Sequence, residues 1–200
     1  MTHLVLVRHG QTDWNLHGRI QGSSDIPLNA TGRRQALDAG RVLAGEGWDA
    51  IVSSPLLRAY ETARILGAEV GIAEIETDDE LRERAYGEAE GLTGHEVDVR
   101  FAGRPVPGRE SRGAVIQRVQ PALIRIAERH PGQSVLVVTH GGVIGSLVRH
   151  ATDYAWPEAG QVILNGSAHR FAYRDGGIGL VEFNGRPWLD PKEDADAPAR

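Results

Sequence analysis

Two histidines in this sequence each follow an apolar run and precede a glycine. His9 lies in the segment Arg-His-Gly-Gln-Thr (8–12), directly after the apolar run at 4–7. His140 lies in Thr-His-Gly-Gly (139–142), directly after the most strand-like run of the chain. Loops at the carboxyl ends of parallel strands form the ligand crevice of an open α/β sheet. We therefore expect both histidines at one edge of a sheet, in a shared site.

An arginine and a carboxylate-rich loop extend this set of candidate residues. Arg58 follows Ser-Ser-Pro-Leu-Leu (53–57), where a further strand end passes into a helix. A cation in the first turn of a helix opposes the helix dipole, so a bound anion would favour this placement. Taken alone, Arg58 would be interpreted as a solvated surface residue. The segment 80–91 is a polar loop with several glutamates, and spacing alone does not select a catalytic one.

The elements that must position these residues alternate between strand and helix. Apolar runs at 4–7, 50–53 and 134–139 predict buried strands. This alternation predicts an α/β fold, with a mostly parallel central sheet in a three-layer α/β/α arrangement. Four helices are expected. The first is N-capped by Thr31 and ends near Gly45 and Gly47, and the second has Pro55 in its first turn and reaches about Leu66. The third is capped by Ser111 and ends before Pro131, and the fourth covers 143–148.

The last third of the chain has a different pattern. Shorter strands are expected at 162–164, 169–173 and 179–183, with a turn at Asp-Gly-Gly (175–177). From Pro187 onward, Pro, Asp, Glu and Ala dominate. We assign residues 1–186 to a single domain and predict a disordered acidic tail at 187–200.

Composition and charge exclude several classes of function. The formal net charge of −5 provides no basic field for nucleic acid or an anionic membrane. The absence of cysteine excludes disulfides, thiolate chemistry and Cys-based metal sites. No signal peptide is recognised at the amino terminus, and no segment approaches the roughly 20 apolar residues of a membrane span. We therefore expect a soluble cytoplasmic protein without a nucleic-acid or membrane partner.

Four motifs together resemble those of one enzyme family. The segment 8–15, Arg-His-Gly-Gln-Thr-Asp-Trp-Asn, resembles the signature of the histidine phosphatase superfamily, also called phosphoglycerate-mutase-like. The segments 54–63, 81–91 and 139–141 resemble its second, third and fourth motifs. The matches come in the family's order and cover about residues 3–150. The resemblance implies the histidine phosphatase fold.

The resemblance also implies roles for individual residues. It implies that His9 is the nucleophile that carries the phosphoryl group and that Glu83 is the proton donor. The expected partner is a small phosphorylated metabolite, and neither a cofactor nor a metal is implied. The implied phosphate-binding residues are Arg8, Asn15, Gln21, Gly22, Arg58, His140 and Gly141.

The chemistry of phosphoryl transfer agrees with these roles. A phosphate dianion repels nucleophiles, so charge on its equatorial oxygens must be neutralised. Arg8 and Arg58 would supply permanently charged planar groups, and a His140 held protonated by the bound dianion would add a third cation. His9 must attack as a neutral imidazole, and we expect its other nitrogen to donate to a backbone carbonyl.

A phosphatase is the predicted function, and three alternatives are weighed against it. The short stretch between Glu83 and His140 leaves little room for the insertion that helps mutases to enclose their substrate, whereas Arg84 and Tyr86 resemble the mutase pattern. A cofactor-dependent phosphoglycerate mutase is therefore the main alternative. A non-catalytic phospholigand-binding module is the second, although no motif residue is lost. A zinc site at His9 and His140 is the third, and no close-set ligand pair supports it.

One loop is the candidate for substrate choice. In the segment 104–112, prolines stiffen the chain and arginines could contact a carboxylate on the substrate. The same composition is equally typical of a solvated loop between two helices, with Ser111 as a helix cap.

Overall fold

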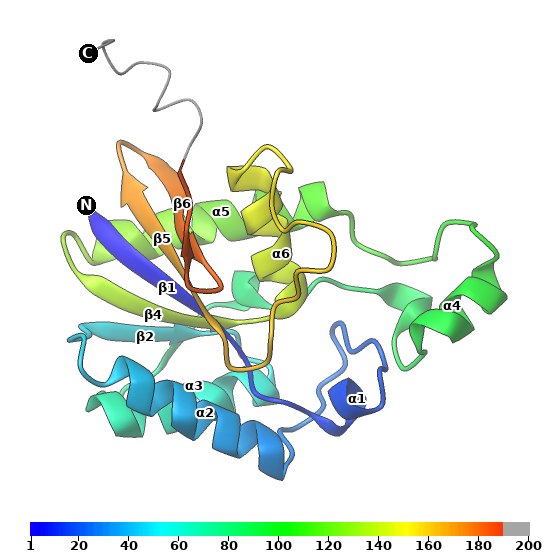
Figure 1. Cartoon of the computed structure of the whole chain (residues 1–200), viewed down its shortest axis with the longest axis horizontal. Coiled ribbons are helices and arrows are strands. Elements are labelled where there is room, and N and C mark those ends of the chain that lie inside the picture. Colours follow the sequence, from blue (N-terminus) through cyan, green and yellow to red (C-terminus); the bar gives the residue numbers. More distant parts are fainter. Residues whose placement is uncertain (190–200) are drawn as a thin grey trace.

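The computed structural model describes residues 1–189, and one seven-stranded mixed sheet runs through them (Figure 1). The strand order is β3-β2-β4-β1-β5-β6-β7. The first four of these strands are parallel, and β5 to β7 are antiparallel. The strands are β1 (Thr2–Arg8), β2 (Ala50–Ser53), β3 (Glu76–Thr77), β4 (Ser134–Thr139), β5 (Ala168–Arg174), β6 (Gly177–Phe183) and β7 (Arg186–Pro187).

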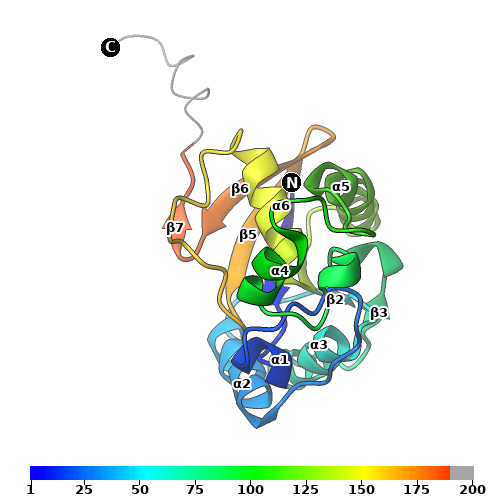
Figure 2. The same ribbon diagram turned by 90° about the vertical axis from the view of Figure 1, so that its right-hand side faces the viewer.

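Helices cover both faces of the sheet, which confirms the predicted α/β class. Helices α2 and α3 pack on one face, and α5 and α6 pack on the other (Figure 1). Helices α1 and α4 lie beyond the carboxyl ends of the parallel strands, on the side of the molecule that faces the viewer in Figure 2. The helices are α1 (Asp13–Leu16), α2 (Ala30–Leu43), α3 (Leu57–Val70), α4 (Gly94–Phe101), α5 (Arg112–Arg129) and α6 (Gly141–Ala151), with 3₁₀ turns at Asp79–Leu81 and Gly87–Ala89.

The central strand β1 is apolar on both sides because both of its faces are buried. Leu4 and Leu6 point into the core under α5 and α6, whereas Val5 and Val7 point into the core under α2 and α3. This alternation follows from the two-residue period of a strand. A strand covered on both faces has no polar side, and this is why the continuous apolar run predicted β1 correctly.

The predicted starts of two helices are wrong by a few residues. The cap of α2 is Asn29, whose side chain accepts from Gly32 N at 2.9 Å, so Thr31 lies inside the helix. Helix α3 begins at Leu57, after Pro55, because the backbone at residue 54 still follows the sheet: Ser54 N donates to the Val138 carbonyl. The predicted cap at Ser111 is confirmed by its bond from Ala114 N.

The segment 162–164 is a loop, so the strand predicted there is wrong. Its carbonyls bond to side chains instead of to a neighbouring strand: Val162 O accepts from Asn184 Nδ2 at 3.1 Å, and Ile163 O accepts from Arg8 Nη1 at 2.5 Å. Long-range side-chain contacts thus override the β-branched composition. The predicted turn between β5 and β6 is confirmed, with φ of 53° at Asp175 and 81° at Gly176.

The predicted tail begins with residues that are paired to the sheet. Pro187 lies in β7 opposite Glu182, and Trp188 N donates to the Val181 carbonyl at 2.8 Å. The Trp188 ring also packs edge-on against Trp156, with ring centroids 5.0 Å apart. The remainder of the predicted tail, from residue 190 to residue 200, lies outside the described residues.

His169 on β5 is a buried structural histidine. Its Nε2 lies 2.9 Å from Ser167 Oγ, its Nδ1 lies 3.3 Å from Asn184 N, and its ring stacks on Phe183. Burial lowers the pKa of His169 from 6.5 to about 4. The folded protein therefore keeps this imidazole neutral at a pH where an exposed histidine is protonated.

We predict that the free energy of unfolding falls as the pH is lowered from 6.5 towards 4. In that window the unfolded state binds a proton at residue 169 that the folded state does not bind, which costs up to about 1.4 kcal/mol per pH unit. Urea unfolding between about pH 7 and pH 5 measures the dependence. A His169→Gln variant should show a shallower slope, and a slope equal to that of the wild type would contradict the assignment.

Candidate active site

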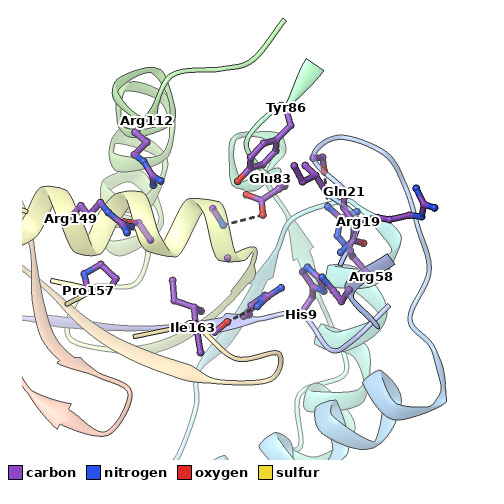
Figure 3. Close-up of a pocket in the computed structure, with 18 of the residues that line it drawn as sticks. His9, Arg19, Gln21, Arg58, Glu83, Tyr86, Arg112, Arg149, Pro157 and Ile163 are labelled. Carbon is purple, nitrogen blue, oxygen red and sulfur yellow. Dashed lines mark hydrogen bonds between the residues drawn. The ribbon is translucent and has the colours of Figure 1, made fainter. Parts of the chain in front are cut away.

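The two predicted histidines meet at the carboxyl edge of the parallel strands. Strand β1 pairs with β4 so that Arg8 lies opposite Thr139, which places His9 and His140 next to each other. Their ring centroids are 5.1 Å apart, with 60° between the ring planes. A pocket of about 400 Å³ opens beside His9 (Figure 3). The strand register therefore brings the two histidines together at one edge of the sheet, as the sequence predicted.

His9 is held as a neutral imidazole with one nitrogen committed to the backbone. Its Nδ1 lies 2.7 Å from the Gly10 carbonyl, so Nδ1 carries the proton and Nε2 carries the lone pair. Burial, with the positive charges of Arg58 and Arg8, holds the pKa of His9 well below its usual range. This is the tautomer and charge state that a nucleophilic histidine requires.

Gly10 allows the loop after β1 to pass close to helix α2. A Cβ atom on Gly10 would lie 2.2 Å from the Gly32 carbonyl oxygen, so no larger residue fits. The Gly10 N–H donates to Thr62 Oγ1 at 3.1 Å, which ties the loop to α3. The Gly10 carbonyl, which orients His9, is therefore fixed from two sides.

Arg8 and Arg58 are anchored by backbone carbonyls and not by carboxylates. Arg8 donates to Ile163 O, and Arg58, with none of its surface exposed, donates to Ser24 O at 2.7 Å and to Gly22 O at 2.8 Å. The Nε atoms of both arginines are buried without a hydrogen-bond partner in the described part of the chain. A carbonyl fixes the geometry of a guanidinium and leaves its full charge in place. The site therefore suits an anion.

His140 is buried beside the charged groups of the site. Its Nε2 lies 2.8 Å from Ser54 Oγ, and its Nδ1 is buried without a partner in the described residues. Burial, followed by the charges of Arg58, His9 and Arg8, holds the pKa of His140 well below its usual range. His140 is therefore neutral in the structure. The predicted imidazolium depends on a bound dianion to favour the charged form.

Glu83 lies across the pocket from His9, at the amino end of α6 (Figure 3). Its Oε1 accepts from Arg84 N at 2.8 Å, and its Oε2 accepts from Gly142 N at 3.1 Å. A Cβ atom on Gly142 would lie 2.5 Å from Glu83 Oε1, so the glycine makes room for the carboxylate. Two backbone donors thus fix Glu83, which is the one acidic residue of residues 1–189 that lines the pocket.

Asn15 and Gln21 line the same pocket as neutral donors. Asn15 Oδ1 accepts from Thr12 N at 3.2 Å and from Asn165 Nδ2 at 3.3 Å, and Gln21 Oε1 accepts from Thr12 Oγ1 at 2.9 Å. With both carbonyl oxygens engaged, the amide NH₂ groups are free to donate to an anion. The pocket lining includes every site residue predicted from the sequence except His140, which contacts His9 from behind.

Glu90 is a site residue whose role the sequence did not reveal. Its carboxylate accepts from the N–H and the hydroxyl of both Ser23 and Ser24, and from Tyr86 N, at 2.7–3.1 Å. Although burial alone would raise the pKa of Glu90, these hydrogen bonds lower it. The loop that Glu90 holds supplies the Gly22 and Ser24 carbonyls that anchor Arg58. Glu90 therefore positions Arg58 without facing the pocket.

The candidate loop at 104–112 contributes one arginine to the pocket. Arg112 lines it, whereas Arg104 donates to the Phe101 carbonyl and Arg109 stacks on the Tyr86 ring.

In residues 1–189, no group of three or more His, Cys, Asp or Glu side chains could hold a metal ion. No helix in that range is long and apolar enough to cross a membrane.

Comparisons with known proteins identify relatives across nearly the whole chain. The family model described as histidine phosphatase superfamily (branch 1) matches residues 4–186. A Bacillus subtilis (strain 168) protein named uncharacterized phosphatase PhoE is 42% identical over 148 residues, which are 74% of this chain and 76% of that protein. Phosphoglycerate mutase-like protein 4 of Arabidopsis thaliana is 40% identical over 192 residues, covering 86% and 80%. A solved structure of mycobacterial glucosyl-3-phosphoglycerate phosphatase with VO₃ has a TM-score of 0.81 and 34% identity, covering 91% and 98%.

We predict that Glu90→Gln weakens the binding of inorganic phosphate or vanadate about 10-fold, because an amide cannot accept all five hydrogen bonds and Arg58 loses its anchored position. Titration calorimetry measures the affinity. Glu88→Gln is the matched control, since the Glu88 side chain is 50% exposed and pairs with Arg100 away from the pocket. Unchanged affinity in Glu90→Gln would show that the Ser23–Ser24 loop keeps Arg58 in place without it.

Proposed function

The chain belongs to the histidine phosphatase superfamily and is a phosphatase, and we propose that it hydrolyses small phosphate monoesters through a phosphohistidine formed at His9. One observation carries this proposal. The neutral His9 ring lies near Arg8 and Arg58, which are anchored by carbonyls and form no ion pair with a carboxylate of residues 1–189, and the Glu83 carboxylate lies across the pocket. This arrangement supplies a nucleophile, a dianion site and a proton donor.

In the first step, Nε2 of His9 attacks phosphorus and the bond from phosphorus to the ester oxygen breaks. Arg8 and Arg58 neutralise the equatorial oxygens as charge redistributes in the transition state. Protonated Glu83 donates its proton to the leaving oxygen, so the organic product departs as an alcohol. The product of this step is a phosphohistidine beside a Glu83 carboxylate.

In the second step, water replaces the alcohol. The Glu83 carboxylate takes a proton from the water as the oxygen attacks the phosphohistidine, and the bond from nitrogen to phosphorus breaks. Inorganic phosphate leaves, and both His9 and Glu83 return to their starting protonation states. The Nδ1 contact to the Gly10 carbonyl keeps one tautomer through both steps.

The mutase alternative loses one of its supports. Of the two residues that resemble the mutase pattern, Tyr86 lines the pocket. Arg84 does not line it: its Nε donates to the Glu110 carbonyl at 2.6 Å, and its guanidinium lies over the Tyr86 ring. Its position is that of a packing residue.

The cytoplasmic location expected from the sequence stays a prediction.

The products of the reaction test the proposed function. We predict release of inorganic phosphate from p-nitrophenyl phosphate or 3-phosphoglycerate, without efficient formation of 2-phosphoglycerate. The trapped phosphoenzyme should be acid-labile and should map to His9. Both products would be followed with and without 2,3-bisphosphoglycerate. Isomerisation that is stimulated by the bisphosphate and far outruns hydrolysis of every ester would overturn the phosphatase assignment in favour of a mutase.

We predict that Glu83→Gln lowers kcat by about 10²–10⁴-fold while phosphate binding stays nearly normal, because the amide keeps the shape and loses the transferable proton. Steady-state kinetics and phosphate titration measure the two effects separately. Glu88→Gln, on the same loop but outside the pocket, is the control. A large loss in that control, or near-normal turnover by Glu83→Gln, would mean that another group is the acid.

A further inference from the structure

The pocket has a second group of positive charge at the end opposite His9. Arg112, in the first turn of α5, and Arg149, on α6, lie across the pocket from His9 and Arg58 (Figure 3). Neither arginine forms an ion pair with an Asp or Glu of residues 1–189. Both arginines line the pocket on the side opposite His9 and Arg58.

One face of α6 connects the two ends of the pocket. Gly141, Gly145 and Arg149 are spaced four residues apart, so they lie on the same side of the helix, and all three line the pocket. Arg149 Nη1 donates to the Gly145 carbonyl at 2.9 Å, and a Cβ atom on Gly145 would lie 3.1 Å from that nitrogen. The glycine thus leaves room for the guanidinium to fold back towards the reacting end.

This geometry sets the spacing between the two charged regions. The Arg149 guanidinium lies at the level of Gly145, four residues from Gly141, which corresponds to about 6 Å along the helix axis. Arg112 adds a second positive charge there. Burial, followed by the charge of Arg112, lowers the pKa of Arg149. Two like charges that face the same space without an acidic partner are stabilised when an anion lies between them.

We propose that the pocket binds phosphate monoesters that carry a second anionic group, a carboxylate or another phosphate, which Arg112 and Arg149 hold a few bonds away from the transferred phosphoryl group. The inference rests on the proposed function, because it takes the His9 end as the phosphoryl site. Pro157 and Ile163 form an apolar wall beside Arg149, which suits the short carbon skeleton between the two anions.

Matched pairs of ligands test the proposal by binding alone. The first pair is 3-phosphoglycerate and glycerol 3-phosphate, which differ by a carboxylate in place of a hydroxymethyl group. The second is fructose 1,6-bisphosphate and fructose 6-phosphate, which differ by a second phosphate. Calorimetry on the full-length His9→Ala protein needs no turnover. A failed hydrolysis assay would therefore count against the proposed function without deciding this inference.

We expect the doubly anionic member of at least one pair to bind about 10- to 100-fold more tightly, as charge-assisted hydrogen bonds predict. Arg112→Gln and Arg149→Gln should each reduce that preference, and Arg149→Lys should restore part of it. Arg34→Gln, on the exposed side of α2, is the control. The pair that shows the preference identifies the second anion. Equal affinities within both pairs, or a preference that survives both glutamine substitutions, would overturn the proposal.

Discussion

The positive charge of two buried arginines is the constraint on which the rest of the site depends. A buried guanidinium cannot neutralise itself by losing a proton, because its pKa is too high. Backbone carbonyls accept hydrogen bonds from the outer nitrogens of Arg8 and Arg58, whereas both Nε atoms have no partner among the described residues. Neither guanidinium forms an ion pair with a carboxylate of residues 1–189. Burial, together with this charge, holds the pKa values of His9 and His140 well below their usual range. In the proposed mechanism, this charge would attract the phosphate dianion and would help to keep His9 neutral for its attack on phosphorus.

Much of this site could be predicted because most of its reactive side chains directly follow the ends of strands. His9, Arg58 and His140 each follow a strand, and parallel strands bring their carboxyl ends to one edge. The glutamates were harder to separate. Glu83 and Glu90 belong to one polar loop, and only the fold shows that the first faces the pocket while the second holds the Ser23–Ser24 loop.

The errors have physical causes that the sequence does not display. Asn29 and Thr31 are both good helix caps, and the choice between them depends on how the chain leaves the preceding loop. No strand forms at 162–164 because the side chains of Arg8 and Asn184, both distant in sequence, donate hydrogen bonds to the carbonyls of this segment. Carbonyl groups are common to all residues, so an anchor made of them leaves no signature in the sequence.

The segment from Pro157 to Asn165 both lines the pocket and holds residues of the catalytic site in position. Residues near its end form hydrogen bonds with Arg8 and His9: Ile163 O accepts from Arg8, and Asn165 Nδ2 donates to the His9 carbonyl at 3.0 Å. Pro157 and Gln161, nearer its beginning, line the pocket, and within the described part of the chain Gln161 forms hydrogen bonds only with Glu158 of the same segment. A substitution at the beginning of this segment would change the pocket wall without removing a contact to Arg8 or His9. Residues at its end hold Arg8 and His9, so substitutions there would disturb the catalytic site. We therefore expect the sequences of relatives to differ more at the beginning of this segment than at its end.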